Sequence, residues 1–143
     1  MTLTRRYHFS ASHRLYNPAL SEPENREIYG RCANPYGHGH NYILEVSVAG
    51  RADAVSGRMV ASKDLDSLIE DEVLRVYRGR NMNLDIDTFV DGRVPTTENV
   101  ARDIRERLER RWPAPGKPFG HTARMPSLSG VRLFETAKNI FDI

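Results

Sequence analysis

The chain has 143 residues, of which 39% are hydrophobic and 28% are charged, the composition of an ordinary folded domain. Its 21 Lys and Arg against 19 Asp and Glu give a net charge of +2, too small to indicate a nucleic-acid-binding protein. The single cysteine, Cys32, cannot form an internal disulfide, which favours a reducing compartment. Residues 1–13 lack the apolar core of a signal peptide, and no apolar stretch has the length of a transmembrane helix. We therefore expect a cytoplasmic protein with one domain over residues 1–143 and no membrane partner.

The first sixty residues predict strands joined by polar loops. Residues 3–12 alternate apolar and polar side chains, which is typical of a strand and puts His8 opposite the apolar face. Residues 24–29 can form a short helix. Residues 41–49 alternate cleanly and predict a second strand, and residues 58–61 are expected to return antiparallel as a third.

Two helices are predicted in the middle of the chain. Ser62 is a plausible N-cap for a helix of about fifteen residues with apolar side chains at helical spacing. A second helix is expected to start at Thr96 or Thr97, where a hydroxyl can cap it, and to end at residues 112–113. Arginines alternate with acidic residues over 102–107, which indicates a solvent-exposed helix face.

The remaining segments complete an α+β pattern. Residues 78–95 are interrupted by Gly and Pro and are expected to be mostly irregular. Residues 113–127 are rich in the same two residue types and predict a loop. Residues 130–135 and 139–143 predict two short final strands. Antiparallel strands with helices between them favour an α+β fold with the helices on one face of the sheet.

The sequence His38-Gly39-His40, six residues after Cys32, is the most informative local pattern. In an extended segment the side chains at i and i+2 point to the same face, so both imidazoles can converge on one point. The intervening glycine leaves that point uncrowded. With His13 at the end of the predicted first strand, three histidines match a catalytic zinc site with one open position. An isolated tripeptide of this kind is also compatible with loop histidines that bind no metal.

Five stretches together resemble the 6-pyruvoyl-tetrahydropterin synthase and 6-carboxy-tetrahydropterin synthase family. They occur in the family's order and cover most of the chain. They are Phe9–Leu15 (FSASHRL), Gly30–Tyr42 (GRCANPYGHGHNY), Asn83–Asp85 (NLD), Thr96–Val100 (TTENV) and Phe134–Thr136 (FET).

The resemblance implies a tunnelling fold, with a four-stranded antiparallel sheet and two helices on one face of it. It also implies trimers, in which the sheets join into a barrel, stacked as homohexamers with active sites between subunits. The cofactor implied is Zn²⁺, held by His13, His38 and His40.

The same resemblance implies a small-molecule pterin substrate bound by Glu135 with help from Thr96 and Thr97. The 2-amino group and N3–H of a pterin are adjacent donors, which one carboxylate can accept together. Cys32 would be the general base that takes a proton from the substrate side chain, while zinc polarises the side-chain oxygens. Taken singly, Glu135 also fits a solvated acid at a strand end, the threonines fit helix caps, and Cys32 fits a small buried apolar residue.

One part of the pattern departs from the family. Members that form the pyruvoyl product carry an Asp-His pair just before the segment matching residues 83–85, and here Arg80 and Asn81 occupy those positions. Neither side chain titrates near neutral pH. Another group can replace the pair, with His121 as the first candidate and His8 as a weaker one. Alternatively, the protein acts on a related pterin through a different proton route, or it binds pterin and zinc without efficient turnover. Arg80 itself suits an anionic substrate, although an exposed loop arginine has the same sequence signature.

The resulting functional prediction is a zinc-dependent lyase that acts on 7,8-dihydroneopterin triphosphate with elimination of triphosphate. The C-x5-HGHNY spacing resembles the pyruvoyl-forming branch more than the carboxy-forming branch of deazapurine and queuosine synthesis, which is the second enzymatic candidate. A pterin-binding paralogue with altered or lost catalysis is the candidate from a different class.

Overall fold

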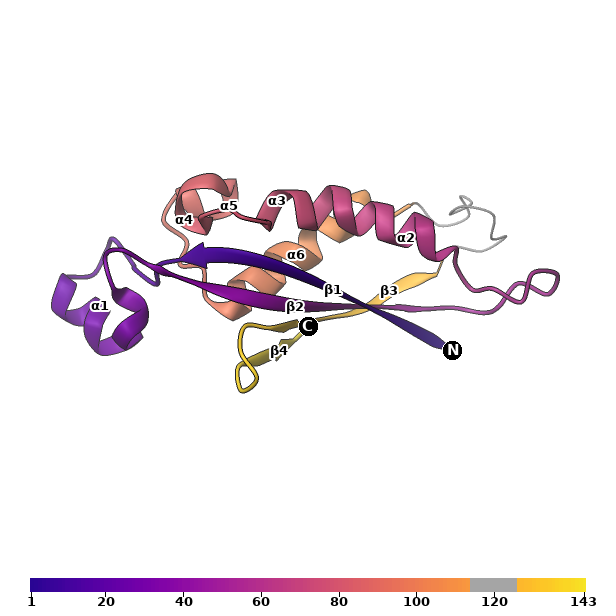
Figure 1. The fold of residues 1–143 in the computed structure, drawn as a ribbon, viewed down its shortest axis with the longest axis horizontal. Coiled ribbons are helices and arrows are strands. Elements are labelled where there is room, and N and C mark those ends of the chain that lie inside the picture. Colours follow the sequence, from indigo (N-terminus) through magenta and orange to yellow (C-terminus); the bar gives the residue numbers. More distant parts are fainter. Residues whose placement is uncertain (114–125) are drawn as a thin grey trace.

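The computed structural model describes residues 1–113 and 126–143, whose strands form one antiparallel sheet (Figure 1). The strand order is β1-β2-β3-β4. Each strand pairs with the next one along the chain in antiparallel register. The strands are β1 (Thr2–His13), β2 (His38–Ala49), β3 (Ser127–Phe134) and β4 (Ile140–Asp142).

The helices of the described residues lie mainly on one face of this sheet. Figure 1 shows α2, α3 and α6 along that face and α1 beyond the ends of β1 and β2. None of these helices is both long and apolar enough to cross a membrane. The helical elements are α1 (Glu22–Tyr29), a 3₁₀ turn (Gly30–Ala33), α2 (Ser62–Ile69), a π-helical turn (Glu70–Leu74), α3 (Arg75–Tyr77), α4 (Met82–Asp85), α5 (Asp87–Val90) and α6 (Thr97–Arg111).

The core lies between the sheet and the helices. Alternate residues of the long strands face inward, and the apolar stripe of α6 packs against them, as the two periodicities predict. The opposite face of the sheet is polar and carries an ion-pair ladder in which Glu45 pairs with Arg6 and Arg132. The largest fully buried apolar side chains include Tyr42, Leu44, Leu65, Ile69, Ile104, Leu108 and Leu133.

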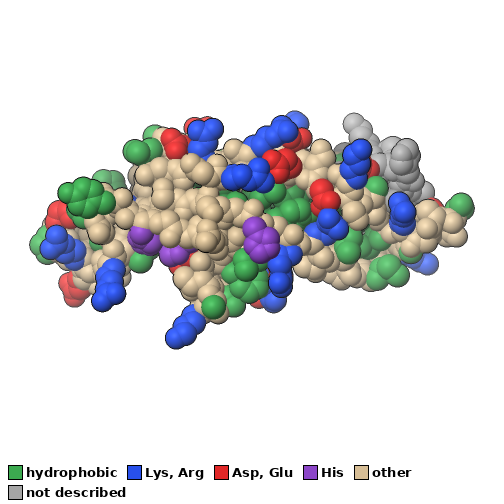
Figure 2. Space-filling model, in the orientation of Figure 1, with side chains coloured by type: hydrophobic (Ala, Val, Ile, Leu, Met, Phe, Trp, Pro, Cys, Tyr) green, Lys and Arg blue, Asp and Glu red, His purple; other side chains and the backbone are tan. Residues whose placement is uncertain are grey.

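Charged side chains of both signs are interspersed over the surface drawn in Figure 2. This distribution agrees with the small net charge and with the many exposed Arg–acid pairs, of which Arg78–Glu70 and Arg105–Glu109 are examples. Exposed pairs of this kind contribute little to stability, because water screens them and ordering two long side chains costs entropy.

The prediction of a strand at residues 58–61 is wrong. Met59 and Val60 are both buried, with exposed fractions of 8% and 5%, and both join the core. Two successive inward side chains are incompatible with a strand that has one covered face, so this segment forms bends and leads into α2.

The prediction of a Ser62 cap is also wrong. Ala61 has the extended backbone of the N-cap position and makes no side-chain capping bond, so Ser62 is the first helical residue. The helix then continues through the π-helical turn to Tyr77, which gives about the predicted length.

Residues 78–95 contain more structure than predicted, because α4 and α5 are single turns too short to show a helical period. Asp103, on a helix face predicted to be exposed, is buried at 1% exposure. Most of the predicted loop at residues 113–127, including His121, lies outside the described residues.

Candidate metal centre and active site

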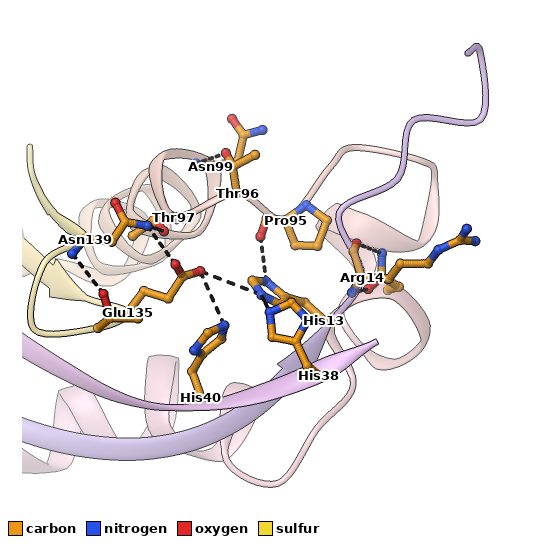
Figure 3. Close-up of polar contacts among 12 residues, drawn as sticks. His13, Arg14, His38, His40, Pro95, Thr96, Thr97, Asn99, Glu135 and Asn139 are labelled. Atoms are coloured by element: carbon orange, nitrogen blue, oxygen red, sulfur yellow. Dashed lines mark hydrogen bonds and ion pairs between the residues drawn. The ribbon is translucent and has the colours of Figure 1, made fainter. Parts of the chain in front are cut away.

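The three histidines singled out by their spacing converge at one end of the sheet (Figure 3). His13 ends β1 and lies opposite His38, the first residue of β2, and His40 follows two positions later on the same face. One nitrogen from each of the three rings lies within 4.8 Å of the other two. The pairing of β1 with β2 therefore brings His13 to two histidines that lie at least 25 positions later in the chain.

The glycines near the cluster have different roles from those predicted. Strand alternation turns Gly39 to the opposite face of the sheet, where a Cβ would make only ordinary contacts at 3.4 Å or more. The prediction that Gly39 keeps the meeting point uncrowded is therefore wrong. Gly37 is the position near the cluster that must be glycine, because its φ is +65° and a Cβ there would lie 2.8 Å from the backbone oxygen of His13.

His13 is held in an orientation that suits a ligand. Its Nδ1–H donates to the carbonyl oxygen of Pro95 at 2.9 Å, so its Nε2 carries the lone pair, and that atom lies 3.2 Å from Nε2 of His38. Burial lowers the pKa of His13 to about 4. Burial also lowers the pKa of His40. Neutral imidazoles at neutral pH are the form that binds a metal.

The polar atoms of the cluster fit a divalent cation. Nε2 of His40 is buried and has no hydrogen-bond partner among the described residues. Such a buried polar atom is costly unless something binds it. Zinc with imidazole ligands at about 2.0–2.1 Å needs ligand nitrogens about 3.3 Å apart, close to the 3.2 Å between His13 and His38. The hydroxyl of the neighbouring Tyr42 is likewise buried without a partner among these residues.

Arg80, just before α4, and Asn83, within α4, brace the end of β1. The carboxamide of Asn83 accepts from the backbone N–H of Arg14 at 2.7 Å and donates to the carbonyl of the same residue at 3.0 Å. The backbone N–H of Ser12 donates to the carbonyl of Arg80 at 2.9 Å. These bonds fix the backbone on both sides of His13.

The two positions that depart from the family pattern have structural explanations of different kinds. Asn81 caps α4, since its side-chain oxygen accepts from the backbone N–H of Asn83 at 3.0 Å. Arg80 is exposed and makes no side-chain hydrogen bond or ion pair with the described residues. With Ser10, Ser12 and other residues it lines a hollow of about 310 Å³, which His40 also borders.

Glu135 lies directly beside the imidazoles. Its Oε1 is 3.7 Å from Nε2 of His13 and 3.8 Å from Nε2 of His40, and its side chain is only 13% exposed (Figure 3). Its Oε2 accepts a hydrogen bond from Nδ2 of Asn139 at 2.7 Å. The same Asn139 nitrogen donates to Oγ1 of Thr97 at 2.9 Å.

The two threonines differ in their surroundings. Thr96 is the N-cap of α6 and accepts from the backbone N–H of Asn99, which confirms the predicted start of this helix. Thr97 is the first helical residue, 3% exposed, and its hydroxyl faces Asn139. Of the two threonines, Thr97 is the one connected to Glu135, through the side chain of Asn139.

Cys32 lies in the 3₁₀ turn before β2 and is partly exposed. Its carbonyl accepts from the backbone N–H of Leu15 at 2.8 Å, which ties the turn to the segment after β1. Burial and then the negative charge of Glu135 raise the pKa of the Cys32 thiol. The surrounding protein groups therefore favour the thiol over the thiolate that a general base requires.

Comparison with known proteins agrees with this geometry. The model of the 6-pyruvoyl tetrahydropterin synthase family matches residues 2–143. The chain belongs to this family. It is 41% identical over 138 residues to 6-pyruvoyl tetrahydrobiopterin synthase of Poecilia reticulata, covering 96% of this chain and 86% of the relative. It is 38% identical over 138 residues to the protein of the same name from Homo sapiens, covering 96% and 87%.

The solved structure of Caenorhabditis elegans 6-pyruvoyl tetrahydropterin synthase superposes on this chain with a TM-score of 0.84 at 35% identity, covering 100% of this chain and 94% of that one. This similarity, together with the four-stranded sheet and its helices, confirms the predicted tunnelling fold of the pterin synthase family.

Sequence reasoning missed several residues that shape the site. Pro95 and Asn139 act through contacts with distant segments, and the pattern gave little sign of them. Asn83 was noted only as part of the NLD motif, and its bonds to Arg14 were not predicted. For Asn139 the available signal was the Thr136-x-x-Asn139 spacing, which is typical of a hydroxyl-organised turn. His8, the weaker substitute for the missing pair, is exposed on the other face of β1, as its alternation predicted.

Proposed function

We propose that the protein is a zinc-dependent pterin lyase that converts 7,8-dihydroneopterin triphosphate with loss of triphosphate. The observation that carries the proposal is the convergence of His13, His38 and His40 beside the carboxylate of Glu135. Family membership and the two relatives named 6-pyruvoyl tetrahydrobiopterin synthase support the substrate class.

The three histidines would hold the zinc ion. The hydrogen bond from Nδ1 of His13 to Pro95 supports this role, because it directs the Nε2 lone pair toward the other two rings. A zinc ion held there would polarise the side-chain oxygens of the substrate and acidify the adjacent C–H bond. The fourth coordination position would be left for the substrate.

Glu135 would bind the pterin ring. A carboxylate accepts both adjacent donors of the pterin edge, the 2-amino group and N3–H, and 13% exposure allows such bonds to form away from bulk water. Thr97 would add a hydroxyl next to this carboxylate, and Thr96 would support it by fixing the start of α6.

Cys32 would accept the proton from the substrate side chain. The negative charge of Glu135 is one of the two causes that raise the pKa of Cys32. Donors of a bound pterin would offset part of that charge and so reduce the second of these causes, which follows burial in size and disfavours the thiolate. This coupling would make the base most effective when the ring is in place.

The assembly proposed for this chain is a homohexamer, a dimer of trimers with active sites between subunits. Two features support it: no described helix covers the polar outer face of the sheet, and β1 and β4 are its edge strands, with β1 bonded along its free edge by residues 79–80 near its end. Analytical ultracentrifugation tests this proposal, and a monomer at micromolar concentration contradicts it.

Product identification tests the proposed reaction. The zinc-loaded protein is incubated with 7,8-dihydroneopterin triphosphate, and mass spectrometry follows the pterin product and free triphosphate. We expect triphosphate release, and we expect Cys32→Ser to abolish it while zinc content stays at the wild-type value.

Two other outcomes would replace the proposal. A carboxylated pterin product would assign the chain to the 6-carboxy-tetrahydropterin branch. Pterin binding without any product would indicate a binding paralogue. One observation specifically favours that alternative: Asn81 serves as a helix cap at a position where an acid/base residue is expected. As a matched pair of metal controls, His40→Ala should lose zinc, whereas His8→Ala on the opposite face should retain it.

A further inference from the structure

The turn between β3 and β4 brings one asparagine into contact with two proposed pterin-binding residues. Glu135 and Asn139 flank this turn, which is closed by a bond from the backbone N–H of Glu135 to the carbonyl of Asn139 at 3.0 Å. Thr136 organises the turn, since its hydroxyl accepts from the backbone N–H groups of Lys138 and Asn139 at 3.2 and 3.0 Å. The position of Asn139 is therefore fixed by the backbone and does not depend on its own side chain.

The side chain of Asn139 uses both hydrogens of one amide nitrogen. One is donated to Oε2 of Glu135 at 2.7 Å and the other to Oγ1 of Thr97 at 2.9 Å (Figure 3). The carboxylate determines this orientation of the amide, because an ionised carboxylate accepts hydrogen bonds and repels the amide oxygen. The amide thus ties the β3–β4 turn to the first residue of α6.

This arrangement has two consequences for ligand recognition. With Oε2 held by Asn139, the Glu135 carboxylate is kept in one rotamer, and its Oε1 faces the imidazoles of His13 and His40. With its oxygen accepting from Asn139, the Thr97 hydroxyl retains its hydrogen as a donor. An acceptor carboxylate beside a donor hydroxyl complements an edge on which two donors lie next to an acceptor, and the 2-amino-4-oxo edge of a pterin has that order.

We propose that Asn139 is a positioning residue that presets Glu135 and Thr97 for the 2-amino-4-oxo edge of a pterin and so determines ring specificity. This inference rests on the proposed pterin function. It assigns to Asn139 a role that acts through its two neighbours, with no step in proton transfer.

The test compares Asn139→Asp and Asn139→Ala with the wild type and with Lys138→Gln. Asn139→Asp has nearly the same shape but has no amide donors, and Asn139→Ala loses the donors without adding a charge. Lys138 lies in the same turn and is exposed, and its side chain makes no hydrogen bond or ion pair with the described residues, so it is the matched control. Fluorescence titration of the zinc-loaded proteins gives the Kd for neopterin, and competition gives the Kd for the 2-oxo analogue, a lumazine.

We expect Asn139→Asp to raise the Kd for neopterin about tenfold or more, the effect of losing a hydrogen bond to a charged group. Asn139→Ala should raise it less, and Lys138→Gln should leave it unchanged. In both Asn139 variants the preference for pterin over lumazine should shrink, while zinc content remains at the wild-type value. A purely structural role would lower thermal stability without changing this preference.

The outcomes separate the two proposals. If the wild type binds neopterin and both Asn139 variants bind it with the same Kd and the same preference over lumazine, the role of Asn139 is overturned and the pterin function stands. If the zinc-loaded wild type binds no neopterin, the pterin function fails and the role of Asn139 falls with it.

Discussion

Two buried polar clusters in this chain are built in opposite ways. The first surrounds Asp103 on α6, whose carboxylate accepts from the hydroxyls of Tyr77 and Thr88, both at 2.5 Å, and from Nε of Arg107 at 2.6 Å. Each oxygen of this carboxylate has a donor, and the donors come from three different segments. Burial, followed by the charge of Asp103, raises the pKa of Tyr77 well above its usual value, so its hydroxyl remains a donor.

The second cluster lies at the histidines and is left incomplete. His40 and Tyr42 each have a buried polar atom without a partner among the described residues, and Nε2 of His13 faces Nε2 of His38. Burial lowers the pKa of His13 and of His40, so these rings stay neutral and cannot form strong ion pairs with Glu135 near pH 7.

The difference between the two clusters separates structural polar groups from functional ones. A fully paired cluster contributes to stability and specifies packing, whereas unpaired buried groups lower stability unless a ligand completes them. The contribution of the Asp103 cluster to the free energy of unfolding should therefore not depend on zinc. The contribution of the histidine cluster should change with zinc and with pH. The following predictions test that contrast.

The largest effect is expected from zinc itself. At a free concentration about a thousand times the Kd, zinc should raise the free energy of unfolding by about 4 kcal/mol, because it binds only the folded cluster tightly. Urea denaturation with and without zinc measures this difference. His40→Ala should remove the effect and His8→Ala should keep it, and an unfolding curve insensitive to zinc would contradict the metal site.

Acidification of the metal-free protein should give the next largest effect. The pKa of His13 is about 4 in the folded chain against 6.5 for the free side chain, so the unfolded state binds more protons between these values. The contribution of His13 is fully present above pH 6.5 and is lost as the pH falls toward 4, by up to about 3 kcal/mol. Denaturation at several pH values measures it, and His13→Gln should lose this part of the pH dependence.

Asp103→Leu should destabilise the protein by about 2 kcal/mol, because it leaves the buried hydroxyl of Tyr77 and the partly buried hydroxyl of Thr88 unpaired while Arg107 can still reach water. The loss should be the same with and without zinc. Glu106→Gln on the same helix is the control, since Glu106 is exposed and makes no ion pair with the described residues, and it should change stability by less than about 0.5 kcal/mol. A zinc-dependent loss in Asp103→Leu would show that the two clusters are coupled.

The smallest effect is expected for Tyr42→Phe in the metal-free protein. Removing a buried hydroxyl that has no partner among the described residues should leave the free energy of unfolding unchanged or raise it by up to about 1 kcal/mol. Loss of more than about 1 kcal/mol in urea denaturation would mean that this hydroxyl is bonded in the folded protein.

The local pattern of the sequence was sufficient for the long elements. Alternation predicted β1 and β2, and hydroxyl capping with a 3.6-residue stripe predicted α6, because these signals repeat over many residues. The same reasoning failed for Met59 and Val60, where burial of two successive side chains depends on what packs over them. It also failed for Asp103, whose acidic character suggested exposure and whose partners come from two other segments.

By itself the sequence determined the ligand-type residues, the strand over residues 41–49, and the family to which five ordered motifs belong, whereas the structure extends that strand back to His38. Only the tertiary structure decided what surrounds those residues. Pro95, whose carbonyl orients His13, lies 82 residues from it in the chain. Asn83 lies 69 residues from Arg14, whose backbone it holds, and Asn139 lies 42 residues from Thr97. Such contacts leave no periodic trace, because each depends on where two separately predicted segments meet when the sheet and α6 pack together.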